Sequence, residues 1–157
     1  MAKPRFFPLD ADLWQVPGPL KLDWPTRKLA IYLREASSHH DDPACYRTRK
    51  RIRQDLGMTA HRLRKSLETL KRWPDKDTPF LRHVDSDDLF ILRPVPNRWV
   101  KAYRAIWESS LPDSHKDVLL FVWSQFETSV PVGNSGSAGR KNLYRCNLYG
   151  KKQPSIV

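Results

Sequence analysis

Residues 47–73 constrain the fold of this 157-residue chain most, because they have the pattern of two short amphipathic helices separated by a glycine. Gly57 can take a positive φ, which lets the chain turn sharply between helices. Thr59 follows it and can cap the second helix. The apolar positions at helical spacing are Ile52, Leu56, Ala60, Leu63, Leu67 and Leu70. The stretch therefore predicts two packed helices, the second running from Thr59 to Trp73.

The opposite side of the second helix is polar and basic. At about 100° per residue, His61, Lys65, Glu68 and Arg72 turn away from the apolar stripe. A short helix with an apolar back and a basic front can enter the DNA major groove. The same pattern also fits a plain helical hairpin whose charged side is only solvated.

The stretch resembles a helix-turn-helix. Gly57 matches the turn glycine, Met58 the apolar residue after it, and Leu63 the buried residue of the recognition helix. Arg53 departs from the pattern, since it stands where the first helix usually has a small residue.

Elements on both sides extend the resemblance. Pro25–Ala36 has the pattern of a helix capped by Asp23. Two β-rich runs, 80–84 and 89–94, flank an Asp/Ser turn and predict a hairpin. Three helices followed by a hairpin resemble a winged helix over about residues 6–95. We therefore expect an α+β, mainly helical fold: a winged helix domain with its N-terminal arm in residues 1–95 and an extension in residues 96–157.

The resemblance implies sequence-specific binding to double-stranded DNA. We expect His61, Arg62 and Lys65 to contact bases. The residues expected at phosphates are Arg47, Arg49, Lys50, Arg51, Thr59, Arg64 and Arg72. At the base of the wing, Arg82, His83 and Arg93 are expected to contribute. The tip carries Asp85, Asp87 and Asp88, which repel phosphate, so it either points away from DNA or meets a protein partner.

The second half is predicted to be a helical layer. Asn97 can cap a helix to about Ser109, and Ser114 with Asp117 resembles a capping box opening a helix to about Phe126. The second helix is apolar almost all round, which indicates burial on more than one side or a homodimer through residues 97–126. A loop over 129–142 and a basic strand over Leu143–Tyr149 follow. Near the start of the chain, prolines exclude a long helix, and we expect a short helical turn at Asp10–Trp14.

Charge and motifs narrow the function further. A net charge of +11 indicates a polyanionic partner. The sequence has no long apolar run and no apolar leader, so we expect a cytoplasmic protein without a membrane segment. The loop carrying His39, His40, Asp41, Asp42 and Cys45 lacks metal-ligand spacing. We expect no metal, no cofactor and no enzymatic activity; Cys45 and Cys146 are expected to be free thiols.

Several roles remain open. A transcription regulator is the preferred one. The opening FFPLDADLW, followed by WPTRKLAIYL, resembles the N-terminal part of plasmid or phage replication initiators. A winged helix can also serve as a protein–protein adaptor without DNA readout, for example a phage protein acting on host machinery. RNA binding is weaker, because no aromatic RNA-binding strand motif is present.

Overall fold

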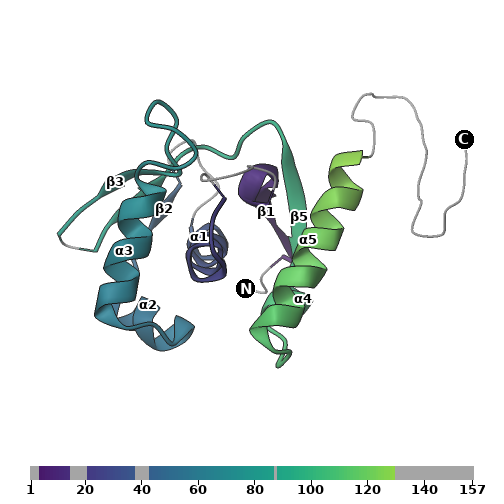
Figure 1. Cartoon of the computed structure of the whole chain (residues 1–157), viewed down its shortest axis with the longest axis horizontal. Helices are drawn as coiled ribbons and strands as arrows, with labels where there is room; N and C mark the ends of the chain where they lie inside the picture. Colours follow the sequence, from purple (N-terminus) through teal and green to yellow (C-terminus); the bar gives the residue numbers. More distant parts are fainter. Residues whose placement is uncertain (1–3, 15–20, 38–42, 87, 130–157) are drawn as a thin grey trace, which may run out of the picture. The chain divides into compact units, whose positions relative to one another are not determined.

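The computed structural model describes residues 4–14, 21–37, 43–86 and 88–129 of the chain (Figure 1). These residues form an α+β structure with more helix than strand and small sheets, as expected. The described residues divide into two compact units, one within residues 8–97 and one of residues 4–7 with 98–129. Each unit is described separately.

The 8–97 unit contains the elements predicted around the helical stretch and one short strand, at Ala44–Cys45, that was not predicted. They are a 3-10 helix at Ala11–Leu13, α1 at Trp24–Ala36, β2 at Ala44–Cys45, α2 at Arg49–Leu56, α3 at Ala60–Leu70, β3 at Leu81–Val84 and β4 at Phe90–Leu92. Both α1 and α2 pack against α3 (Figure 1). The short turn expected near Asp10–Trp14 is confirmed as the 3-10 helix.

The predicted turn between α2 and α3 is confirmed. Gly57 has φ 65° and ψ 37°, the left-handed conformation that ends α2. The Met58 N–H then donates to the Arg53 carbonyl at 3.0 Å. Thr59 caps α3 by accepting from the Arg62 N–H at 3.1 Å. The helix ends at Leu70, three residues earlier than predicted, where Lys71 and Arg72 form a turn.

A buried charge cluster holds α1 in place. Arg34 is 1% exposed and donates from Nε to Asp10 at 2.6 Å. Arg93, which follows β4, donates to the same carboxylate at 3.0 Å. Arg93 also bonds Asp12. A buried arginine needs such partners because its desolvation is costly, so this cluster joins the start of the unit to its end.

The predicted hairpin is confirmed as β3 and β4. Leu81 pairs with Leu92 and Val84 with Phe90, antiparallel and with an irregularity between Leu81 and His83. The loop expected to carry His39 to Cys45 is partly wrong, because Ala44 and Cys45 form β2, which pairs antiparallel with β4. Two residues are too short to show a strand period in sequence.

The other unit corrects the predicted helix at Arg98–Ser109. Trp99–Tyr103 is a strand, β5, paired with β1 at Phe6–Asp10. Only Arg104–Trp107 is helical, as α4. Exposed Trp99 alternates with buried Val100 and Ala102, a period of two that favours a strand. Asn97 therefore caps no helix.

The last described helix, α5, spans Asp113–Ser129 and packs on β5 and α4. Ser114 lies inside it, so the predicted capping box is wrong. Burial on several sides is also wrong within the described residues: Leu120 is 2% exposed, but Val118 is 58% and Leu119 is 42% exposed. The strand predicted at 143–149 lies outside the described residues, as does the 129–142 loop beyond Ser129.

Within the described part of the chain, no helix has the length and apolar character needed to cross a bilayer.

Candidate nucleic-acid interface

The outward side of α3 is solvent-exposed and mainly basic. The exposed residues are His61, Arg64, Lys65, Glu68, Lys71 and Arg72. Leu63, Leu67 and Leu70 form the buried side, as the spacing predicted. The single acid on the outward side, Glu68, pairs with Lys71 at 2.8 Å. Arg64 and Lys65 on the helix, with Arg72 just beyond its end, thus remain a cationic stripe.

Arg62, predicted to contact bases, is instead held by α1. Its guanidinium forms an ion pair with Asp23 and also donates to the Thr26 hydroxyl at 3.3 Å. The Asp23 carboxylate caps α1 at the same time by accepting from the Thr26 N–H at 3.1 Å. Burial alone would raise the pKa of Asp23, but the hydrogen bonds from Thr26 and Arg62 outweigh it and lower the pKa below 3.8. A base contact by Arg62 therefore requires this pair to open.

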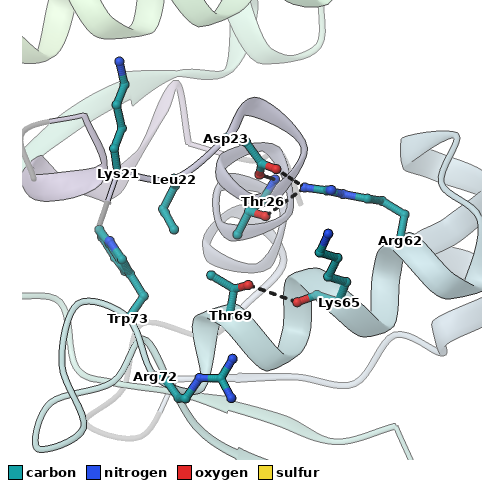
Figure 2. A pocket seen from close by; sticks show the side chains of 9 residues that line it. All are labelled: Lys21, Leu22, Asp23, Thr26, Arg62, Lys65, Thr69, Arg72 and Trp73. Atoms are coloured by element: carbon teal, nitrogen blue, oxygen red, sulfur yellow. Dashed lines mark hydrogen bonds and ion pairs between the residues drawn. The ribbon is translucent and has the colours of Figure 1, made fainter. Parts of the chain in front are cut away.

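An open pocket of about 320 Å³ lies between the start of α1 and α3 (Figure 2). In Figure 2, Arg62 reaches from α3 toward Asp23 and Thr26, and Lys65 stands in the middle of the pocket. Arg72 borders it beyond the end of α3. The sequence gives no signal for this pocket, because residues far apart in the chain form its walls.

Several predicted phosphate contacts on and before α2 are engaged within the protein. Arg49 forms an ion pair with Asp88 at the wing tip, and its Nη2 donates to the Asp85 carbonyl at 3.1 Å. Arg47 stacks over the Tyr32 ring and bonds its hydroxyl at 3.1 Å. Lys50 is exposed beside them.

Arg51 is also exposed but pairs with Asp55 at 2.9 Å, one turn along α2. The Arg49–Asp88 pair turns part of the acidic tip toward α2, which neither expectation for the tip included. Asp87 lies outside the described residues.

The wing prediction is wrong for Arg93. Its side chain is 11% exposed and is held by Asp10 and Asp12. Burial would lower its pKa, but these two carboxylates raise it above its usual value. Arg93 is thus largely covered, and its guanidinium is engaged within the protein rather than presented at the surface. Arg82 and His83 are exposed on β3, as the prediction requires.

A second hollow, of about 440 Å³, lies on the other side of α3, toward β3. Its apolar lining is Ala60, Leu63, Leu67 and Val84, and its charged lining is Arg49, Arg53, Arg64, Glu68 and Lys71. Arg53, the residue that departs from the helix-turn-helix pattern, is exposed at this edge. The long side chain at the usually small position is thus accommodated by solvent.

The loop with His39, His40, Asp41, Asp42 and Cys45, for which no metal was expected, lies mostly outside the described part of the chain, since residues 38–42 are not described. Among the described residues, no group of His, Cys, Asp or Glu side chains could hold a metal ion. Cys45 is a buried free thiol, and burial raises its pKa. Cys146 lies beyond the described residues.

Comparison of the chain with protein-family models, with curated proteins and with solved structures finds no match.

Proposed function

We propose that the chain is a winged helix protein that binds double-stranded DNA sequence-specifically and acts as a transcription regulator. The observation that carries the proposal is the outward side of α3, which is basic and solvent-exposed. The helix follows the Gly57 turn directly and is capped by Thr59. The net charge of +11 supports a polyanionic partner. The element order α1, β2, α2, α3, β3, β4 supports the winged helix assignment.

Contacts are assigned by position on α3. His61 and Lys65 lie in its first turns and are exposed, as base contacts require. Arg64 and Arg72 flank them and would contact the phosphates of the DNA backbone, as would Thr59 at the N-cap of α3. Lys50 on α2 adds a backbone contact. Arg62 would join the bases only after leaving Asp23.

One module of this size reads a short site, so useful specificity requires a second module or a dimer. The exposed apolar residues of α5, within the 97–126 segment, support a dimer.

Selection from a random duplex library at physiological salt tests the proposal. We expect one enriched motif, and binding that weakens steeply with salt. Lys65→Ala should relax the preference at particular base positions. Lys50→Ala should weaken all sequences alike and reduce the salt slope by about 1. Lys76→Ala, an exposed lysine between α3 and β3, is the matched control. Salt-sensitive binding without an enriched motif contradicts sequence-specific readout.

A replication initiator would use the same surface. The location of the selected site distinguishes the two roles, since a regulator's site lies at a promoter and an initiator's at an origin.

An adaptor that binds protein is the second candidate, favoured by the hollow between α3 and β3. Its apolar lining and basic edge suit an acidic amphipathic helix. Under this alternative the library yields no motif, and Arg53→Ala weakens partner binding while Lys50→Ala does not.

A further inference from the structure

The pocket between α1 and α3 has more positive charge than its single acidic residue can neutralise. The charged residues that line it are Lys21, Asp23, Arg62, Lys65 and Arg72. Asp23 is the one acid among these lining residues, and it is bound by Arg62 and by the Thr26 N–H. The Arg62–Asp23 pair is therefore close to neutral, and the lysines and Arg72 supply the excess.

Two of these cations come from α3 and the turn that follows it. Lys65 lies on α3, and Arg72 lies in the turn after the helix ends at Leu70. Thr69 lies between them, and its hydroxyl donates to the Lys65 carbonyl at 3.1 Å. Both cations are exposed. Glu68, the nearby acid, forms its ion pair with Lys71 and is also attracted to Arg72. Lys65 and Arg72 both line the pocket, and long side chains from such positions can rotate to bind one compact anion.

Arg62 adds to the donor excess. Its Nε–H is covered and meets no acceptor among the residues that the structure describes. A buried donor without an acceptor is costly, and a bound anion nearby compensates for it electrostatically.

We propose that this pocket binds the phosphate group of a small phosphorylated ligand, with Lys65 and Arg72 as the principal donors. A phosphate monoester carries nearly two negative charges at pH 7, whereas a phosphodiester carries one, so the excess of cations favours the monoester. The recessed shape also favours a compact ligand, since about 300 Å³ is the lower range of small-molecule pockets. A DNA backbone would instead follow the convex ridge of α3.

The consequence for DNA rests on the proposed function. Lys65 and Arg72 belong both to this pocket and to the outward stripe of α3. A phosphorylated ligand that occupies them competes with DNA for the same cations, so it would act as a regulator that releases the duplex.

Backbone amide shifts of the full chain, titrated with inorganic phosphate at constant ionic strength, test the site. We expect saturating shifts centred on Lys65, Thr69 and Arg72. Glycerol phosphate, a monoester, should bind similarly, and dimethyl phosphate, a diester, about tenfold more weakly. Arg72→Gln should weaken phosphate about tenfold. Arg64→Gln is the matched control, because Arg64 is an exposed arginine of α3 that does not line this pocket.

Shifts spread evenly over the basic surface, with equal losses in Arg64→Gln and Arg72→Gln, would overturn the proposal. Equal binding of dimethyl phosphate would overturn the monoester preference and assign the pocket to backbone phosphate. Failure of the two proposals is distinguishable. If the chain binds phosphate in the pocket but binds no duplex, the phosphate site stands and the proposed DNA binding fails. If the chain selects a duplex motif but has no saturable phosphate site, DNA binding stands and the phosphate site fails.

Discussion

Asp23 holds Arg62 across the space between the start of α1 and α3 while it caps α1. One carboxylate thus both stabilises a helix end and restrains an arginine of the proposed recognition helix. The restraint predicts that Asp23 limits DNA binding.

Replacing Asp23 by Asn should tighten duplex binding about fivefold, because one charge that repels phosphate at about 1 kcal/mol is removed and Arg62 is released. Asn caps helices about as well as Asp. The ion pair is partly exposed, so its loss should cost less than about 1 kcal/mol of stability. Fluorescence anisotropy and thermal melting measure the two effects. Glu108→Gln, the same charge change at an exposed site after α4, is the control; equal tightening in both variants would mean that only net charge matters.

Removing the charge of Asp10 should strongly destabilise the 8–97 unit. Asp10 is 0% exposed and forms ion pairs with both Arg34 and Arg93. Asp10→Asn leaves these arginines buried without their shared anion, which costs about 3–5 kcal/mol. Asp12→Asn, at a side chain that is 35% exposed, should cost less than about 1 kcal/mol. Urea unfolding compares them, and equal losses would show that the cluster is not effectively buried.

The pH dependence of stability should change in Tyr32→Phe. The Tyr32 hydroxyl donates to Asp55 at 2.6 Å, and this hydrogen bond is the main cause that lowers the pKa of Asp55 below 3.8. Burial, together with this bond, raises the pKa of Tyr32 to about 12. A carboxyl with a depressed folded pKa stabilises the fold above its unfolded pKa, and the contribution is lost as pH falls through the folded pKa.

We therefore expect Tyr32→Phe to cost at most about 1 kcal/mol at neutral pH, since the carboxylate is solvent-screened. The difference should shrink below about pH 4. Carboxyl NMR titration should show the Asp55 midpoint rising toward 3.8. Tyr46→Phe makes the same chemical change at a residue that is 77% exposed and should alter neither quantity. An unchanged Asp55 midpoint in Tyr32→Phe would contradict the assignment.

Gly57→Ala should destabilise the unit through the backbone alone. The glycine has φ 65°, and a Cβ there would meet no atom within 4 Å. The cost is then the left-handed penalty of a non-glycine residue, about 1–2 kcal/mol, and Gly57→Asn should cost less. Urea unfolding measures both. A loss well above this range would indicate a steric contact instead.

The local parts of the fold were predictable because local chemistry fixes them. The Asp23 and Thr59 caps, the Gly57 turn and the hairpin around Asp85–Asp88 each follow from residues close in sequence. The strand at Trp99–Tyr103 was mistaken for a helix, because five residues with mixed spacing fit both periods. Pairing with β1 makes this segment a strand, and β1 lies about 90 residues earlier in the chain, where a local pattern cannot indicate it.

The candidate site was predictable only as a helix face. Exposure of His61 and Lys65 follows from helical spacing, but the ion partners of Arg49, Arg62 and Arg93 do not. Each partner is tens of residues distant, so a basic residue in the sequence says nothing about the carboxylate beside it. Several of the basic residues in the sequence are therefore cations that the protein already neutralises.

Asp10 and Arg93 are separated by 83 residues, although they share a hydrogen bond. A ribosome delivers Asp10 early in synthesis and Arg93 much later. Until Arg93 is present, the Arg34 guanidinium also lacks the Arg93 carbonyl, to which its Nη1 donates in the folded unit. The buried ion pairs of this unit therefore cannot all form until nearly the whole unit has been synthesised.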